Sequence, residues 1–401
     1  MACNWKHKIL TYIDIQIEEI MKKVLVLGLL IGALGLSGCS FDDGSAKEQG
    51  NKNTQSKQTE VLSQNVSEIA ETQTEEAEEI VEPVINTITV TATGDCTLGK
   101  MQDHGYSGSF NAYYDSYGED YFFDGVRDVF ESDDFTIVNL ECVLSNSEAR
   151  VDKTYNLKGK PEYVGIMSGS SVEACSLGNN HSRDYGEQSL KDTQTVLDEA
   201  GIVYAYNDHI GTYTTDEGMT IGVVSASLLS KSADYENYLY NGIQQLKEQG
   251  TDLIIASCHW GIEREYYPND YQKRVAHELI DKGADLVIGN HPHVLQGVEL
   301  YNGKIICYSL GNFCFGGNRN PSDKDTMMFQ QTFTYVDGVL QTDVNAKIIP
   351  CMISSTSSYN DFKPTITTDD RKGLIIDNVN TYSEPYSNIK FSDSGMLTIK
   401  E

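Results

Sequence analysis

Side chains that bind metal ions or transfer protons recur just after apolar segments of this sequence. They are Asp95 in TATGD, Glu141 in VNLE, Asn180 and His181 in SLGNNH, His259 in SCHWG, and His291 and His293 in IGNHPHV. Each residue alone also has a structural interpretation, as a helix cap or a hydrogen-bonded core histidine. Because loops at the carboxyl ends of parallel strands converge on one crevice, the recurrence predicts a single cluster.

The types of these residues indicate which ions the cluster would bind. His291 and His293 are two positions apart, which in extended backbone directs both rings to one side, and Pro292 stiffens the segment. Carboxylate, amide and imidazole ligands without a set of thiolates suit Mn, Fe or Zn at an open site. We expect one or two divalent transition metal ions. Cys258, beside His259, is expected in the core.

The elements that position these residues alternate between strands and helices. Helices are expected over 187–200, ended by Gly201, and over 269–282, between Pro268 and Gly283. This order predicts βαβ units and a largely parallel sheet. After about residue 325 the pattern changes to an antiparallel extension with a hairpin at 331–344 around Asp337-Gly338. The expected strands are 87–93, 135–141, 172–178, 221–227, 252–258, 285–289 and 304–311.

The N-terminal 86 residues are expected to carry an export signal and a tether. Residues 21–40 combine a basic start, an apolar run and small residues, as a secretory signal does; the alternative is a short buried helix. LSGC ends in Cys39, which we expect to be lipidated, so that the protein is anchored to the outer face of the bacterial cell membrane. We assign residues 1–39 to this signal and residues 40–86 to a disordered acidic tether. Within the first range, we expect translation to start at Met21.

Charge and cysteine content narrow the functional classes. The formal net charge of −29 repels nucleic acid and other polyanions unless a bound cation or a local basic patch intervenes, so nucleic acid is excluded as a partner. Of nine cysteines, seven remain after Cys3 and Cys39 are set aside. Because the number of these cysteines is odd and they lie in apolar strand-like runs, we expect free buried thiols. One or two disulfide bridges remain an open alternative.

Longer segments resemble the CapA family of bacterial capsule and poly-γ-glutamate synthesis proteins. The similar stretches are GDCTLG, NLE, SLGNNHSRDYGEQSLKDTQTVLDEAGI, and CHWGIEREYYPNDYQKRVAHELIDKGADLVIGNHPHVLQGVELYNGKIICYSLGNF, in order from about residue 88 to 316. The resemblance implies a calcineurin-like metallophosphoesterase fold: an α/β four-layer sandwich of two mixed sheets flanked by helices, with a C-terminal antiparallel extension. We assign 87–325 to this domain and 326–401 to the extension.

The resemblance also implies roles for individual residues. Metal ligation is implied for Asp95, Glu141, Asn180, His259, His291 and His293. His181 would stand beside the scissile group, with Asp184 orienting it, and Asn312 would form the floor of the site, unless SLGNF is only a turn after a strand. The first strand lacks the Asp-x-His of the wider superfamily, so one metal position is expected to be weak or empty. Asp103 and His104 either compensate or form an ordinary exposed pair.

Two functions follow from this resemblance and stay open at the level of sequence. In the first, the protein is a surface hydrolase that acts on a phosphoester or related bond in an envelope or capsule polymer. In the second, it binds or anchors the polymer within a capsule synthesis complex without turnover. A complete set of metal ligands favours the hydrolase, but such a set also persists in proteins where a bound metal only stabilises the fold.

Overall fold

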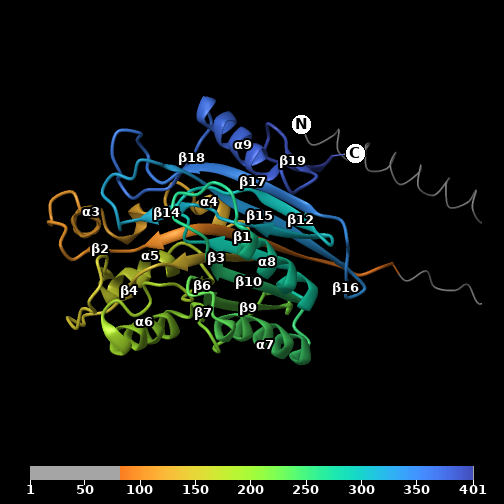
Figure 1. The fold of residues 1–401 in the computed structure, drawn as a ribbon, viewed down its shortest axis with the longest axis horizontal. Coiled ribbons are helices and arrows are strands. Elements are labelled where there is room, and N and C mark those ends of the chain that lie inside the picture. Colours follow the sequence, from red (N-terminus) through yellow and green to blue (C-terminus); the bar gives the residue numbers. More distant parts are fainter. Residues whose placement is uncertain (1–81, 401) are drawn as a thin grey trace, which may run out of the picture. The chain divides into compact units, whose positions relative to one another are not determined.

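The computed structural model describes residues 82–400 (Figure 1). The expected signal at 1–39, including Cys39, and most of the expected tether lie outside this range. The first strand already begins at Ile85, where it pairs with Val336, so the last two residues of the expected tether belong to a sheet. Within 82–400, no helix is long and apolar enough to cross a membrane.

The larger sheet is mixed, and β1 lies at its centre. β1 pairs in parallel with β3 on one side and antiparallel with β15 on the other. From edge to edge the order is β18, β17, β15, β1, β3, β6, β7, while β14 also pairs with β1 and β16 with β15. The strands are β1 (Ile85–Thr97), β3 (Phe135–Leu140), β6 (Ala174–Ser176), β7 (Val203–Ala205), β14 (Asn312–Phe315), β15 (Asp325–Val336), β16 (Val339–Leu340), β17 (Asn345–Met352) and β18 (Thr365–Ile366).

The smaller sheet contains a run of four parallel strands. β9, β10, β11 and β13 are parallel neighbours, and each edge is closed by an antiparallel strand, β8 beside β9 and β12 beside β13. Every strand expected from sequence is present, but 172–178 is shortened to Ala174–Ser176, and 304–311 ends at Cys307 because the chain leaves this sheet there and enters β14 of the other. The strands are β8 (Gly211–Thr214), β9 (Thr220–Ser227), β10 (Leu253–His259), β11 (Leu286–Asn290), β12 (Val298–Tyr301) and β13 (Lys304–Cys307).

The main helices begin and end where local chemistry places their ends. α6 (Gly186–Ala200) ends at Gly201 and α8 (Asp270–Lys282) ends at Gly283, both with left-handed glycines, as the sequence predicts. A capping box of Asn269 and Gln272 begins α8. α7 (Ala233–Gln249), which was not among the predicted helices, begins at the N-cap Ser232.

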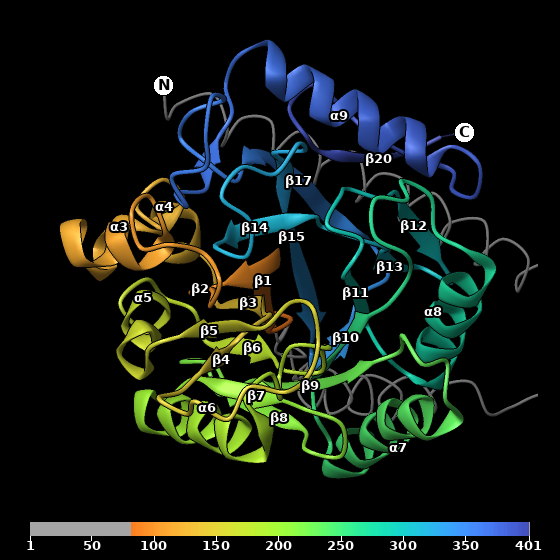
Figure 2. The ribbon, with the colours of Figure 1, turned by 60° about the vertical axis from the view of Figure 1, so that its left-hand side comes forward.

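Alternating side chains divide the apolar residues into layers. Ile137 and Ile255 face the core between the two sheets, whereas their neighbours Val138 and Ile254 face outward. The outer face of the larger sheet is covered by α6, and that of the smaller sheet by α7 and α8 (Figure 2). The expected four-layer sandwich, with two mixed sheets flanked by helices, is therefore confirmed.

The C-terminal part extends the larger sheet and closes one side of the core. β15, β17 and β18 are antiparallel, and the predicted hairpin is confirmed by the pairing of Val336 with Val339. A helix that the strand-like pattern did not predict, α9 (Asp370–Ser383), contacts β12 and β17 and places Ile375 and Val379 in the core between the sheets. A hairpin of β19 (Ile389–Phe391) and β20 (Leu397–Ile399) lies beside it.

Short elements surround the end of the sandwich that carries the metal-binding types of residue. They enclose an aromatic cluster in which Phe110 stacks on Phe122 at 4.2 Å between ring centroids. The elements are β2 (Lys100–Met101), β4 (Val143–Leu144) and β5 (Leu157–Gly159), the helices α3 (Phe110–Tyr117), α4 (Arg127–Phe130) and α5 (Val164–Ser168), and the 3-10 helices η1 (Glu119–Tyr121) and η2 (Pro161–Tyr163).

The cysteines of the described chain are buried and free, as the sequence predicts. They are Cys96, Cys142, Cys175, Cys258, Cys307, Cys314 and Cys351. Cys258 packs in the outer core under α7 and α8, which agrees with its expected role as a small apolar residue.

Candidate metal centre

The candidate site forms where the carboxyl ends of parallel strands from both sheets meet. Asp95 lies near the end of β1, Glu141 directly follows β3, and His259 is the last residue of β10. His291 directly follows β11. All four side chains are buried. The strand-end rule therefore brings together residues as far apart in the chain as Asp95 and His291, which are 196 positions apart.

Asp95 links the two sheets at the base of the site. Its Oδ1 accepts a hydrogen bond from Asn139 Nδ2 at 2.7 Å, and its Oδ2 accepts one from the backbone N–H of His291 at 3.2 Å. The same Oδ2 lies 3.1 Å from His293 Nδ1. A carboxylate with this many partners is fixed in position, so Asp95 is preorganised for whatever the site binds.

Glu141 is the strongest structural sign of a cation site. Its side chain is fully buried, and neither carboxylate oxygen has a hydrogen-bond partner among the described residues. His259 Nε2 lies 3.4 Å from Glu141 Oε1, and His293 Nε2 lies 3.8 Å from the same oxygen. Because burial of an unpaired carboxylate is costly, this arrangement fits a site built to hold a divalent ion.

The histidines surround Glu141 with their ring nitrogens directed inward. One ligand atom each from Glu141, His291 and His293 lies within 4.8 Å of the others. His291 Nδ1 is 3.1 Å from His259 Nε2. The backbone of His291 has φ 95° and that of His293 has φ 58°, a conformation that costs free energy in non-glycine residues and is typical of functional sites.

The protonation of the cluster follows from its burial and its charges. Burial lowers the pKa of both His259 and His291 to about 3, so both rings are neutral and can donate lone pairs to a cation. Burial and the Asp95 charge raise the pKa of Glu141 to about 8. Burial opposes protonation of His293 as well, but the charges of Glu141 and Asp95 outweigh it and raise the pKa of this ring to about 10.

His181 lies at the edge of the cluster and is held from behind. Its Nδ1 is 2.6 Å from Asp184 Oδ2, which also accepts a hydrogen bond from the Leu157 backbone N–H at 2.6 Å. Lys153 forms an ion pair with the other Asp184 oxygen and lies 3.3 Å from His181 Nδ1. The free ring nitrogen, Nε2, faces Glu141 Oε1 at 3.9 Å. Asp184, the residue expected to orient His181, therefore contacts the ring nitrogen on the opposite side from Glu141.

The geometry does not place Asn180 among the ligands. Asn180 is exposed and lines a separate hollow of about 280 Å³ together with Arg183 and Tyr206. Its neighbour Asn179 is buried instead, because its amide donates to Leu140 O at 2.9 Å and to Asn139 Oδ1 at 3.2 Å. The inward amide of the Asn-Asn-His motif is therefore the first asparagine, and it acts as a support.

Asn312, the residue expected at the floor of the site, lies beside His293. It begins β14, pairs with Asp95 of β1, and its Oδ1 is 2.9 Å from His293 Nδ1. The close approach of the two strands depends on Gly94, where a Cβ would come within 2.0 Å of the Gly311 carbonyl oxygen. The Asp95 N–H donates to that carbonyl at 2.9 Å, so the glycine pair fixes Asp95 above the floor.

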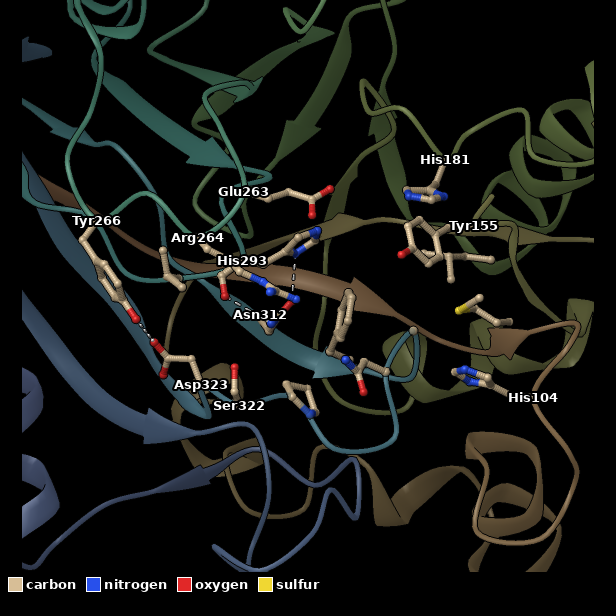
Figure 3. A pocket seen from close by; sticks show the side chains of 17 residues that line it. His104, Tyr155, His181, Glu263, Arg264, Tyr266, His293, Asn312, Ser322 and Asp323 are labelled. Carbon is tan, nitrogen blue, oxygen red and sulfur yellow. Dashed lines mark hydrogen bonds between the residues drawn. The ribbon is translucent and has the colours of Figure 1, made fainter. Parts of the chain in front are cut away.

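A cavity of about 350 Å³ opens above the cluster (Figure 3). His181, His293 and Asn312 line its inner part, and Figure 3 shows the Glu263 carboxylate directed toward the space between the two histidines. The outer wall contains Tyr155 and Tyr266. The cluster is thus accessible to a ligand from one side, which is the arrangement of an open rather than a structural metal site.

The residue that replaces the histidine of the Asp-x-His pattern at the first strand has a structural contact instead. Thr97 stands where the wider pattern has a histidine, and its hydroxyl donates to the Glu141 carbonyl oxygen at 3.2 Å. His104 lines the outer cavity, whereas Asp103 is exposed and pairs with Arg150 at 3.0 Å. Neither Asp103 nor His104 belongs to the group of residues whose ligand atoms converge.

Three supporting residues were not predicted. Asn139 joins Asp95 to Asn179 and lies 3.4 Å from His259 Nδ1. Its position two residues before Glu141 on one strand was a usable signal, because alternate residues share a face. Lys153 and Glu263 come from loops, whose approach to the cluster depends on tertiary structure, so no local pattern marks them.

A comparison with known families decides the assignment. The model of the family described as bacterial capsule synthesis protein PGA_cap matches residues 89–317. The chain belongs to this family. The matched segment contains all the converging residues described above, from Asp95 to Asn312, and the resemblance to the CapA family found in the sequence is confirmed.

Individual relatives agree with this assignment. The chain is 32% identical over 220 residues to the PGA biosynthesis protein CapA of Bacillus subtilis, covering 49% of this chain and 57% of the relative. It is 29% identical over 253 residues to the capsule biosynthesis protein CapA of Bacillus anthracis, covering 57% and 60%. The matches therefore span little more than half the length of these relatives.

Solved structures also align with this chain. A hypothetical protein from Thermus thermophilus aligns with a TM-score of 0.41 and 14% identity, covering 66% of this chain and 99% of that one. The 5'-nucleotidase of Candida albicans aligns with a TM-score of 0.39 and 12% identity, covering 74% and 58%.

Proposed function

We propose that this PGA_cap-family protein takes part in capsule or poly-γ-glutamate biosynthesis through a metal-dependent, phosphoesterase-like site. The single observation that carries the metal-dependent part is Glu141, whose two buried oxygens lack partners within the described chain while imidazole nitrogens converge on them. The names of its Bacillus relatives support the biosynthetic setting.

One or two ions of Mn, Fe or Zn would be held by Asp95, Glu141, His259, His291 and His293. When bound, such an ion neutralises charge on the reacting group and lowers the pKa of water. These five residues supply two carboxylates and three imidazoles, which suit borderline divalent ions better than Mg or Ca.

His181 would move the proton in a hydrolytic reaction. Its Nε2 faces the cluster, while Asp184 holds Nδ1 and thereby fixes the tautomer and the direction of the ring. Asp184 is itself held by Lys153 and by the Leu157 backbone, so the ring is preorganised. This arrangement suits His181, in its doubly protonated imidazolium form, as a general acid that delivers its Nε2 proton to the leaving oxygen of a phosphoester or related bond in an envelope polymer.

We further propose that the protein is exported and anchored to the outer face of the cell membrane through a lipid on Cys39. The support is the sequence alone, in which a basic start, an apolar run and LSGC follow one another. Mass spectrometry of the purified mature protein tests this directly. A mature N-terminus at Cys39 carrying acyl chains is expected, and an unmodified N-terminus elsewhere would exclude it.

The function is tested by turnover of defined substrates by purified full-length protein, with and without Mn²⁺. The substrates are a generic phosphodiester and a γ-linked glutamate polymer, and His181→Ala is the matched variant. Metal-dependent turnover of either substrate that falls at least ~100-fold in His181→Ala supports a hydrolase. Bound metal with no turnover of either substrate would contradict hydrolysis and would favour a component that only holds the polymer.

A further inference from the structure

The negative charge of this protein opposes the binding of a polymer that carries carboxylates. The formal net charge is −29, and such a field repels polyanions unless positive charge is concentrated locally. Most arginines of the described chain cannot supply that charge freely, because carboxylates already pair with them. The paired arginines are Arg127, Arg150, Arg183, Arg274 and Arg371.

The two remaining arginines of residues 82–400 lie at or beside the cavity. Arg264 lines the cavity and forms no ion pair within the described chain. Arg319 likewise forms none there, and its guanidinium donates only to the Gly105 carbonyl at 3.3 Å. Lys100 lies nearby, but its ammonium already donates to the backbone carbonyls of Met101, Gln102 and His104. Arg264 and Arg319 are therefore the two arginines of the described chain whose charge is not paired with a carboxylate.

The backbone of Arg264 is held in an unusual conformation next to the metal ligands. Its φ is 66°, and its N–H donates to the Pro292 carbonyl at 2.8 Å. Pro292 lies between His291 and His293, which also have positive φ values. A strained residue tied to the ligand segment indicates a position that is fixed for function rather than for stability.

We propose that Arg264 binds a carboxylate of an anionic polymer beside the metal centre, and that Arg319 binds a second one beside the cavity. This inference rests on the proposed function and names the substrate class of the same site. A guanidinium offers a planar fork that matches a carboxylate with two hydrogen bonds. The two unpaired guanidinium groups, together with a bound divalent ion, would supply the local positive charge that an acidic protein needs to accept such a chain.

The acidic groups of the cavity do not cancel these charges by pairing. Asp323 accepts a hydrogen bond from Tyr266 at 3.1 Å and forms no ion pair within the described chain. Glu263 is directed toward the space between His181 and His293. Arg264 therefore keeps its donors available for a ligand.

Binding rather than turnover tests this proposal. The probe is a fluorescent γ-linked glutamate decamer, titrated into Mn²⁺-loaded full-length His181→Ala protein so that no chemistry intervenes. Adding Arg264→Gln is expected to weaken binding about tenfold or more, since hydrogen bonds to charged groups are the stronger ones. Adding Arg319→Gln instead is expected to weaken it less. Arg274→Gln on α8, which removes the same charge from an ion-paired site, is the control and is expected to change nothing.

The outcomes separate this inference from the proposed function. Unchanged binding in Arg264→Gln, with strong binding in the parent protein, would overturn the inference and leave the function intact. Metal-loaded parent protein that does not bind the decamer at all would overturn the polymer assignment itself. Tighter binding of inorganic polyphosphate of equal length would replace the carboxylate by a phosphate as the recognised group. Full metal content and an unchanged melting temperature in Arg264→Gln verify that the variant is folded.

Discussion

His181 Nδ1 lies 2.6 Å from Asp184 Oδ2, while the opposite ring nitrogen faces Glu141 across 3.9 Å. One nitrogen is thus engaged in orientation and the other is directed at the candidate metal centre. Asp184→Asn keeps the shape but removes the charge that fixes the tautomer. We expect kcat to fall about 100-fold or more while metal content stays unchanged. Equal kcat in Asp184→Asn and wild type, measured with matched metal content, would contradict this role.

Lys153 is expected to act through Asp184 rather than on the substrate. It pairs with Asp184, donates to the Asn180 carbonyl at 2.8 Å and lies 3.3 Å from His181 Nδ1. Lys153→Met removes the positive charge but keeps much of the side-chain volume. We expect kcat to fall about tenfold and its pH profile to shift, with partial recovery in Lys153→Arg. A loss confined to thermal stability, with an unchanged pH profile, would reduce Lys153 to a structural residue.

Glu141→Gln is expected to have opposite effects on the metal-free and metal-loaded protein. Burial raises the pKa of Glu141 to about 8, so between its unfolded pKa and pH 8 the native state holds a proton that the unfolded state releases. Stability of the metal-free protein therefore falls as pH rises through that window. The variant removes this titration, and at a pH above that window, without metal, we expect it to be more stable than wild type by about 1 kcal/mol or more.

Urea unfolding with a chelator, at about pH 5 and about pH 8.5, measures this effect on either side of the titration. Added Mn²⁺ should then stabilise the wild type and leave Glu141→Gln unchanged, because only the former binds the ion. A metal-free Glu141→Gln protein that is less stable than wild type at both pH values would show that Glu141 has an unrecognised partner.

A second acidic site, Asp133, predicts a pH dependence that has nothing to do with metal. Burial is the largest influence that raises its pKa, to about 7, and Glu173 adds to it. Its Oδ2 accepts from Thr136 Oγ1 at 2.8 Å, but its Oδ1 is buried without a hydrogen bond in the described structure. Because the folded pKa is raised, stability is lost as pH rises through about 7.

Asp133→Asn should therefore stabilise the protein by about 1 kcal/mol at about pH 8 and have less effect at about pH 5. Denaturant unfolding at the two pH values measures the difference. Asp128→Asn on α4, which removes an exposed carboxylate, is the control. Equal gains for both variants would indicate a general charge effect instead of burial.

The sequence predicted the parts of this fold that depend on local patterns. The helices 187–200 and 269–282 were predicted because Gly201 and Gly283 mark their ends and Pro268 precedes the second helix. The convergence of Asp95, Glu141 and the histidines followed from their places at strand ends. Helix α9 was missed, since its apolar residues face a core formed by distant strands β12 and β17.

The finer arrangement of the site depends on contacts that no local pattern records. The sequence could not distinguish Asn179 from Asn180, because which amide turns inward is decided by Leu140 O and Asn139, about 40 residues earlier in the chain. Lys153 reaches Asp184 across a loop, and Arg264 is tied to Pro292 through its backbone. Such residues become visible only when the tertiary structure is known.

Metal content tests the central claim most directly. Full-length wild-type protein, His291→Ala and the control Arg274→Gln are loaded with Mn²⁺, passed over a desalting column and analysed by mass spectrometry for Mn per chain. We predict about one ion or more per chain in wild type and control, and almost none in His291→Ala. Wild-type protein without bound Mn, Fe or Zn after loading, or His291→Ala protein with full metal content, would contradict the account.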